Sequence, residues 1–165
     1  MKRLLKVSIC TLASLSLLPA AALAGTYSPS GSGGAGPSTV QVKKGITLTC
    51  TLTASTTSNG TISSTGTPSG TKITSIALSG GLCGAVSFTG MPYDVSATSS
   101  TDVIIHDVRV TGITGNCRGD LKAKLVGGVL QFNHANTIPS DPAGGSPCSM
   151  QGNVSTSPTA SYSYP

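Results

Sequence analysis

The sequence predicts an all-β fold, a single antiparallel β-sandwich or barrel-like domain over residues 39–165 that is cross-linked by disulfides. Three observations support this prediction: alternating polar and apolar residues, a composition of small and β-branched side chains, and four widely spaced cysteines. Residues 25–165 contain 21 threonines and 22 serines, and the whole chain contains 21 glycines. These residue types favour strands and turns and are poor helix formers. The length of 165 residues fits one domain.

The clearest alternation lies in GITLTCTLTA, residues 45–54. Threonines occupy one face of this segment, and apolar residues occupy the other. A period of two over ten residues indicates a half-buried antiparallel strand whose outer face is a ladder of threonines. Asn59-Gly60 follows, and this favoured hairpin dipeptide predicts a return strand at TIS, residues 61–63. The apolar face consists of Ile46, Leu48, Cys50, Leu52 and Ala54.

Further short strands are expected along the chain, separated by Gly, Pro and Asn, as in a sandwich or barrel. In residues 101–111, Ile104, Val108 and Val110 share a face with His106, which we interpret as an accommodated side chain rather than a ligand. In residues 120–126, apolar residues alternate with two lysines. The expected strands are 71–79, 85–89, 93–98, 101–111, 120–126, 129–133 and 149–156.

Residues 1–24 have the pattern of a cleavable signal peptide. Lys2, Arg3 and Lys6 precede an apolar stretch at 7–18, and Ala22-Leu23-Ala24 forms a cleavage site before Gly25. The stretch is shorter than the ~20 apolar residues that span a bilayer. We therefore expect a secreted chain, extracellular or at the cell surface, that is not membrane-spanning.

Residues 25–38, GTYSPSGSGGAGPS, are expected to form a flexible N-terminal arm because they are rich in Gly, Ser and Pro. Gly31, Gly33 and Gly36 match G-x-G-x-x-G. No strand pattern precedes them and no helical pattern follows, so a dinucleotide site is not predicted.

The cysteines that follow the signal peptide predict disulfides. Cys50, Cys83, Cys117 and Cys148 are an even number in a chain expected to be exported. Their spacings of 33, 34 and 31 residues lack the close pairs of zinc sites, so no metal site is expected. Four cysteines allow three pairings, and the sequence does not choose among them; pairing of neighbours, Cys50–Cys83 with Cys117–Cys148, is preferred.

Charge and motifs argue against nucleic-acid binding and against catalysis. Three of the ten Lys and Arg residues lie in the signal peptide, so seven remain against five Asp, and the chain has no Trp. Nucleic-acid binders cluster basic residues and use aromatics for stacking. No nucleophile elbow, zinc motif or phosphate loop occurs, and His106 and His134 lie in no motif. No enzyme activity, catalytic residue or cofactor is predicted. Arg118-Gly119-Asp120 spells an adhesion tripeptide, which we interpret as a chance occurrence.

Six segments, spread over residues 26–158, carry a resemblance to a known family. The chain resembles the small secreted activator proteins of bacterial alkane oxidation, the Pra type. It departs from the expected pattern at Tyr93, where the resemblance leads us to expect a Trp. The segments are TYSPSG, GITLTCTLT, GGLCG, MPYDVSAT, GNCRG and SPCSMQGNVSTSP.

The resemblance implies a non-enzymatic role in the use of n-alkanes, through emulsification or attachment at the oil–water boundary. The expected partner is then a hydrophobic substrate, a cell surface or an abiotic surface. Candidate contacts are Met91, Pro92 and Tyr93, together with Tyr162 and Tyr164 in the C-terminal tail. The alternatives are a surface adhesin, a biofilm matrix protein or a self-associating, pilin-like fibre subunit. A secreted hydrolase or carbohydrate-binding module fits poorly, because aromatic and acidic residues are scarce.

Overall fold

The computed structural model describes residues 24–66 and 68–164. Residues 1–23 of the predicted signal peptide lie outside the described residues, so the signal peptide and the cleavage before Gly25 stay predictions. No helix among the described residues is long and apolar enough to cross a membrane.

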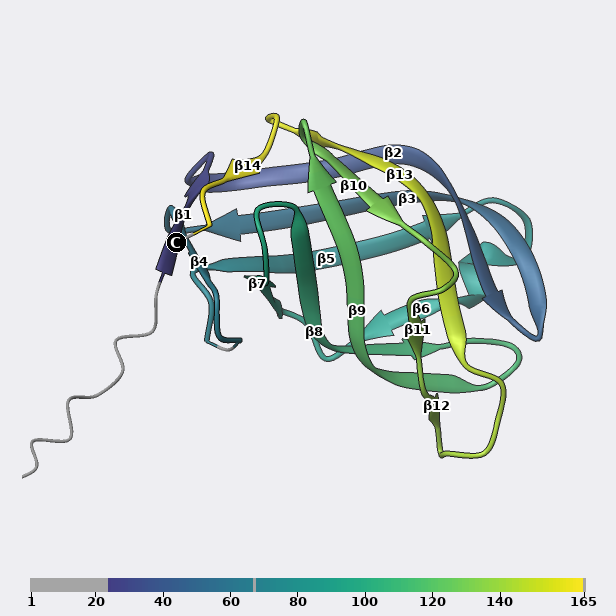
Figure 1. Ribbon diagram of the computed structural model, residues 1–165. Helices are drawn as coiled ribbons and strands as arrows, with labels where there is room; N and C mark the ends of the chain where they lie inside the picture. Colours follow the sequence, from purple (N-terminus) through teal and green to yellow (C-terminus); the bar gives the residue numbers. More distant parts are fainter. Residues whose placement is uncertain (1–23, 67, 165) are drawn as a thin grey trace, which may run out of the picture.

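Eight antiparallel strands form a closed barrel (Figure 1). Their order is β7-β5-β3-β2-β13-β10-β9-β8, and pairing of β8 with β7 closes the sheet. The single all-β fold predicted from the sequence is thereby confirmed, in its barrel form. The strands are β2 (Gly31–Lys44), β3 (Ile46–Ser58), β5 (Thr71–Ser79), β7 (Tyr93–Ala97), β8 (Asp102–Thr111), β9 (Asn116–Val126), β10 (Val129–Phe132) and β13 (Cys148–Ser157).

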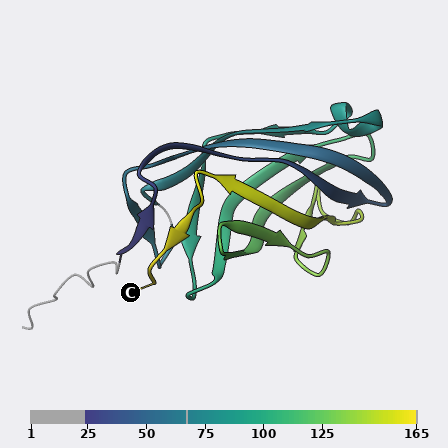
Figure 2. The same cartoon turned by 90° about the horizontal axis from the view of Figure 1, so that it is seen from above.

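Shorter elements lie at the two ends of the barrel. β1 (Ala24–Ser28), β4 (Thr61–Ser63) and β14 (Ser161–Tyr162) gather at one end, on the left in Figures 1 and 2. The 3-10 helix η1 (Gly81–Ala85) and the turn between β2 and β3 lie at the other end. Three further strands pair at the edges of barrel strands: β6 (Ser87–Thr89) with β8, β11 (Thr137–Ile138) with β13, and β12 (Ser140–Asp141) with β9.

In β3 and β9, alternate side chains point into the core, as the sequence pattern predicts. Cys50 and Leu52 are buried in β3 while its threonines face outward. In β9, Leu121, Ala123 and Leu125 are buried between exposed lysines. These strands match the prediction because an uninterrupted strand keeps its period of two.

Strand β8 does not keep that period, so the predicted face of Ile104 is wrong. Val103 and Ile105 are buried before the bulge, where Ile104 is only half-buried, whereas Val108, after the bulge, is buried as predicted. The register with β9 shifts between Ile105 and Val108, and Asp107 has a φ of 48°. A β-bulge inserts one residue and reverses the direction of the side chains that follow.

The predicted hairpin at Asn59-Gly60 is also wrong in its pairing. The dipeptide makes a turn, with a φ of 89° at Gly60, but β4 pairs with β1 and β7 rather than with β3. Strand β5 occupies the edge of β3 that the return strand would have taken. A turn dipeptide specifies a local reversal of the chain, whereas the partner depends on which strand reaches the free edge.

Residues 25–38 are not a flexible arm. They form most of β1 and the first half of β2, which pairs with β3 on one side and β13 on the other. Gly36, with a φ of 82°, allows β2 to lie close to β3, because a Cβ at this position would lie 2.2 Å from the carbonyl oxygen of Leu52. Backbone hydrogen bonds order this segment, and the Gly-rich composition does not reveal them.

Candidate functional site

One end of the barrel is covered by β1, β4 and β14. Ile62 and Ala160 are buried there, and the Tyr162 hydroxyl donates a hydrogen bond to the Ser99 carbonyl oxygen at 2.8 Å. Burial raises the pKa of Tyr162 to about 12, so this hydroxyl stays a neutral donor at physiological pH.

The opposite end of the barrel holds an apolar cavity of about 70 Å³ that opens to solvent. Its lining comes from the β2–β3 turn, β6, the β8–β9 turn and β13, segments that lie far apart in the sequence. We call this region the barrel mouth. Apolar side chains of its lining include Val42, Leu48, Val86, Phe88, Val110 and Met150.

A second apolar cavity of about 30 Å³ lies in the barrel interior. Phe88, Leu121 and Met150 line both cavities, so the two are adjacent. These three side chains therefore form a wall shared by the mouth and the interior cavity.

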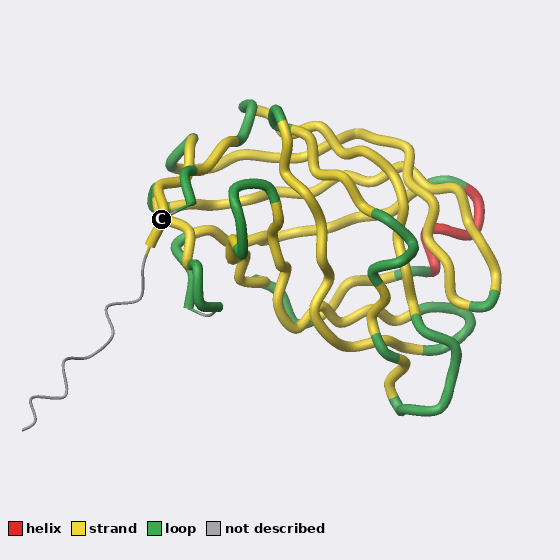
Figure 3. Tube along the Cα trace, viewed as in Figure 1, coloured by secondary structure: helices red, strands yellow, loops and turns green. Residues whose placement is uncertain are grey.

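Exposed apolar side chains surround the mouth. Ile46 is 45% exposed and Ile113 is 57% exposed, and both line the cavity. Leu82, 59% exposed, lies on η1, which sits at the same end of the barrel in Figure 3. Apolar side chains gathered on adjacent turns, rather than scattered singly, mark an interaction surface.

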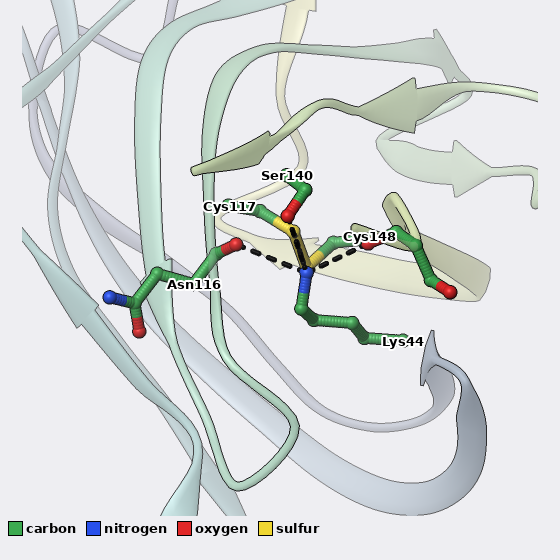
Figure 4. Close-up of a disulfide and its surroundings, with 6 residues drawn as sticks. Lys44, Asn116, Cys117, Ser140 and Cys148 are labelled. Carbon is green, nitrogen blue, oxygen red and sulfur yellow. Dashed lines mark hydrogen bonds between the residues drawn. A yellow bond between two sulfur atoms is a disulfide. The ribbon is translucent and has the colours of Figure 1, made fainter. Parts of the chain in front are cut away.

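Lys44 lies beside the mouth, but its ammonium group is bound to other parts of the protein (Figure 4). It donates to the carbonyl oxygens of Ser146 at 2.7 Å and Asn116 at 3.1 Å. It also donates to Ser140 Oγ at 3.2 Å and to Cys117 Sγ at 3.4 Å. These four contacts tie the β2–β3 turn to the segments around the Cys117–Cys148 disulfide.

Two disulfides hold the elements of the mouth. Cys50–Cys83 attaches η1 to β3, and Cys117–Cys148 joins β9 to β13. This is the preferred neighbour pairing, which the sequence left open. Cys83 thus anchors the helix that carries Leu82.

No buried side-chain nitrogen or oxygen among residues 24–66 and 68–164 lacks a hydrogen-bond partner. The lining of the mouth is mainly apolar, with Lys43, Lys44, Thr114 and Ser149 as its polar side chains. A sugar, nucleotide or peptide in it would lose hydrogen bonds to water and gain few in return. An apolar ligand avoids this penalty.

The five residues predicted as interfacial contacts lie elsewhere, since none lines the mouth. Pro92 and Tyr164 are exposed, and Met91 and Tyr162 are half-buried. Tyr93 is only 2% exposed and therefore a core residue, which corrects its placement at the surface. Sequence reasoning missed Ile46 and Ile113, which follow glycines at the two turns that line the mouth.

Three strands also bring together a serine, a histidine and an aspartate that sequence reasoning did not connect. Ser96 Oγ lies 2.6 Å from His106 Nε2, and His106 Nδ1 lies 3.3 Å from Asp120 Oδ2. This order is that of a nucleophile, base and orienting carboxylate. Ser96 is only 1% exposed, so a substrate carbon has no access to its oxygen. The three residues make a structural polar network.

The Arg118-Gly119-Asp120 tripeptide lies within β9 rather than on a presented loop. Arg118 Nε donates to Asp107 Oδ1 at 2.6 Å, and Asp120 Oδ1 accepts from the Asp107 backbone nitrogen at 3.0 Å. Both charged residues of the tripeptide are thus engaged in holding the β8 bulge.

The ion pairs of Asp107 at the β8 bulge are expected to make the stability of the protein depend on pH. Hydrogen bonds from Arg118 and Arg109 lower the pKa of Asp107 from 3.8 to about 2. A lowered pKa in the folded state stabilises the protein above about pH 4, and this contribution is lost as the pH falls towards 2. Because Asp107 is half exposed, we expect Asp107→Asn to lower the free energy of unfolding by about 1 kcal/mol at most. Asparagine tolerates the positive φ, so the substitution tests the charge.

Urea unfolding at pH 7 and pH 2 measures this effect, with exposed Asp141→Asn as the matched control. The difference between wild type and Asp107→Asn is expected at pH 7 and should be much smaller at pH 2, where Asp107 is about half protonated in the folded protein. A difference of equal size at both pH values would show that the Asp107 charge is not its source.

The comparisons with known proteins agree with the resemblance noted in the sequence. No curated protein and no solved structure matches the chain. A family model described as alkane oxidation protein activator PraA/PraB-like matches residues 1–164. The description names an activator of alkane oxidation rather than an oxidase. Because the match spans nearly the whole chain, this β-barrel protein belongs to the PraA/PraB-like family of alkane oxidation activators.

Proposed function

We propose that the protein supports bacterial use of n-alkanes without catalysis, by adsorbing at the oil–water boundary through the barrel mouth. Adsorption there would promote emulsification of the alkane or attachment of cells to it. The observation that carries the proposal is the apolar mouth, with Ile46, Ile113 and Leu82 exposed at one end of a barrel whose chain belongs to an alkane-related family.

The physical basis is the transfer of exposed apolar area from water to oil. Each side chain that leaves water gains roughly 25 cal/mol per Å² of apolar area. The disulfides keep η1 and β13 in place, so the barrel can present this surface without unfolding. They are also compatible with an extracellular protein, since disulfides persist in oxidising compartments. Export through the predicted signal peptide is part of the proposal.

The exposed residues Pro92 and Tyr164 are a second set of candidate contacts that rests on the sequence alone. Tyr164 lies at the covered end of the barrel, beyond β14, whereas Ile46 and Ile113 line the mouth. Substitutions at the two ends therefore separate the two sets.

The test is hexadecane–water interfacial tension and emulsion lifetime with the oxidised protein. Wild type is expected to lower the tension, and the double variant Ile46→Ser/Ile113→Ser is expected to lose most of that effect. Tyr164→Ser and Val126→Ser, which remove exposed apolar side chains outside the mouth, are the matched controls and are expected to behave as wild type.

Two other results would change the conclusion. Loss of activity in Tyr164→Ser but not in the double variant would move the contact surface to the C-terminal end. A wild-type protein no more surface-active than an inert protein of similar size would reject the interfacial role, and the adhesin and fibre-subunit alternatives would replace it.

A further inference from the structure

We propose that the barrel mouth binds the methyl end of a single unbranched alkyl chain, inserted end-on into the cavity. This inference rests on the proposed function, which it deepens from adsorption on a bulk oil surface to recognition of one chain. The protein would then hold individual alkane molecules as well as coat droplets.

The cavity size sets how much of a chain is bound. A cavity of ~150 Å³ holds one benzene molecule, six carbon atoms. In proportion, the 70 Å³ at the mouth and the 30 Å³ beneath it take about four carbons together. The occupant is therefore the end of a chain, with the remainder passing out between Ile46 and Ile113.

The arrangement of the two cavities favours a linear occupant. Phe88, Leu121 and Met150 line both spaces, so a guest would pass between these side chains to enter the inner cavity. Met150, on β13, is one of these shared side chains. Its unbranched, flexible side chain can adjust to a narrow guest. A compact, branched molecule of the same carbon number would fill the mouth without reaching the inner space.

The chemistry of the lining selects an alkyl group. The ammonium group of Lys44, which lies beside the cavity, is held by Ser146, Asn116, Ser140 and Cys117. No buried polar side chain of the described residues awaits a partner. A guest without hydrogen-bonding groups therefore matches the site, and both a free alkane and the acyl chain of a lipid carry such an end.

Methyl NMR of the oxidised protein tests the inference, with n-pentane dissolved in buffer as the probe. Shifts are expected at Leu48, Val110 and Met150, and weaker or no shifts with neopentane at the same concentration. Val110→Phe fills the cavity; losing about three buried methylene groups corresponds to an affinity loss of about fiftyfold. Val126→Phe adds the same bulk at an exposed site outside the mouth and is expected to bind like wild type.

A second filling variant, Leu48→Phe, keeps the test decisive if Val110→Phe does not fold. Monomeric dihexanoyl phosphatidylcholine forms a separate arm: shifts with this lipid but not with n-pentane would assign the site to acyl chains and overturn binding of free alkane. Equal shifts with neopentane would overturn end-on binding of a linear chain.

The outcome is separable from that of the proposed function. If wild type lowers the hexadecane–water tension but shows no n-pentane shifts, the single-chain site is rejected and adsorption stands. If it shows the shifts but leaves the tension unchanged, the site stands and adsorption is rejected.

Discussion

Removal of both disulfides is expected to leave the protein largely unfolded in water. Each bridge closes a loop, with separations of 33 and 31 residues. Loops of this length stabilise the folded state by about 3–4 kcal/mol each through the entropy of the unfolded chain. The two loops do not overlap, so the effects should nearly add. Their sum of about 6–8 kcal/mol is comparable to the whole free energy of unfolding of many domains, ~5–15 kcal/mol.

Urea unfolding of Cys50→Ala/Cys83→Ala, Cys117→Ala/Cys148→Ala and the quadruple variant measures these contributions. Wild type under reducing conditions is the control and should match the quadruple variant. A double variant that loses less than about 1 kcal/mol would show that the bridge does not restrict the unfolded chain as this loop-entropy argument requires.

Tyr93→Ala is expected to lower the free energy of unfolding by about 3–5 kcal/mol, the range for truncating a buried aromatic side chain. The ring is fully buried at the start of β7. Its hydroxyl donates to the Thr89 carbonyl oxygen at 2.5 Å and accepts from the Arg109 backbone nitrogen at 3.3 Å. Tyr93 thus connects β7 to β8, the pair that closes the barrel.

Tyr93→Phe separates the two contributions, because it keeps the ring and removes the hydroxyl. A loss of about 1–2 kcal/mol is expected, since two backbone groups lose a partner. Tyr164→Ala, at an exposed tyrosine, is the matched control and should change stability by less than about 0.5 kcal/mol. Equal effects of Tyr93→Ala and Tyr164→Ala would contradict the burial of Tyr93.

The sequence reveals the strands better than their partners. The expected strand at 71–79 coincides with β5, and those at 101–111 and 129–133 match β8 and β10 to within a residue at each end. Alternation and turn residues act locally, so they are visible in the sequence. The Gly-rich β2 and the partner of β4 escaped prediction, because backbone pairing between distant segments leaves no pattern in composition.

The contact residues proposed from the sequence differ from those that line the barrel mouth. The sequence indicated an apolar contact surface near exposed residues, yet Tyr93 proved to be buried, and the mouth is formed by Ile46 and Ile113 on turns 67 residues apart. Neither isoleucine is unusual alone. Only closure of the barrel places the two turns at the same end.

The sequence by itself determined that this protein is an all-β domain with four cysteines available for disulfides and with six segments that resemble those of alkane oxidation activators. The tertiary structure decided which cysteines pair, which way β8 points after its bulge, and which end of the barrel is left open. The physical reason is the distance along the chain over which each interaction acts. A strand's alternation follows from its own backbone geometry, whereas pairing, closure and burial depend on hydrogen bonds and contacts between residues that meet only in the folded chain.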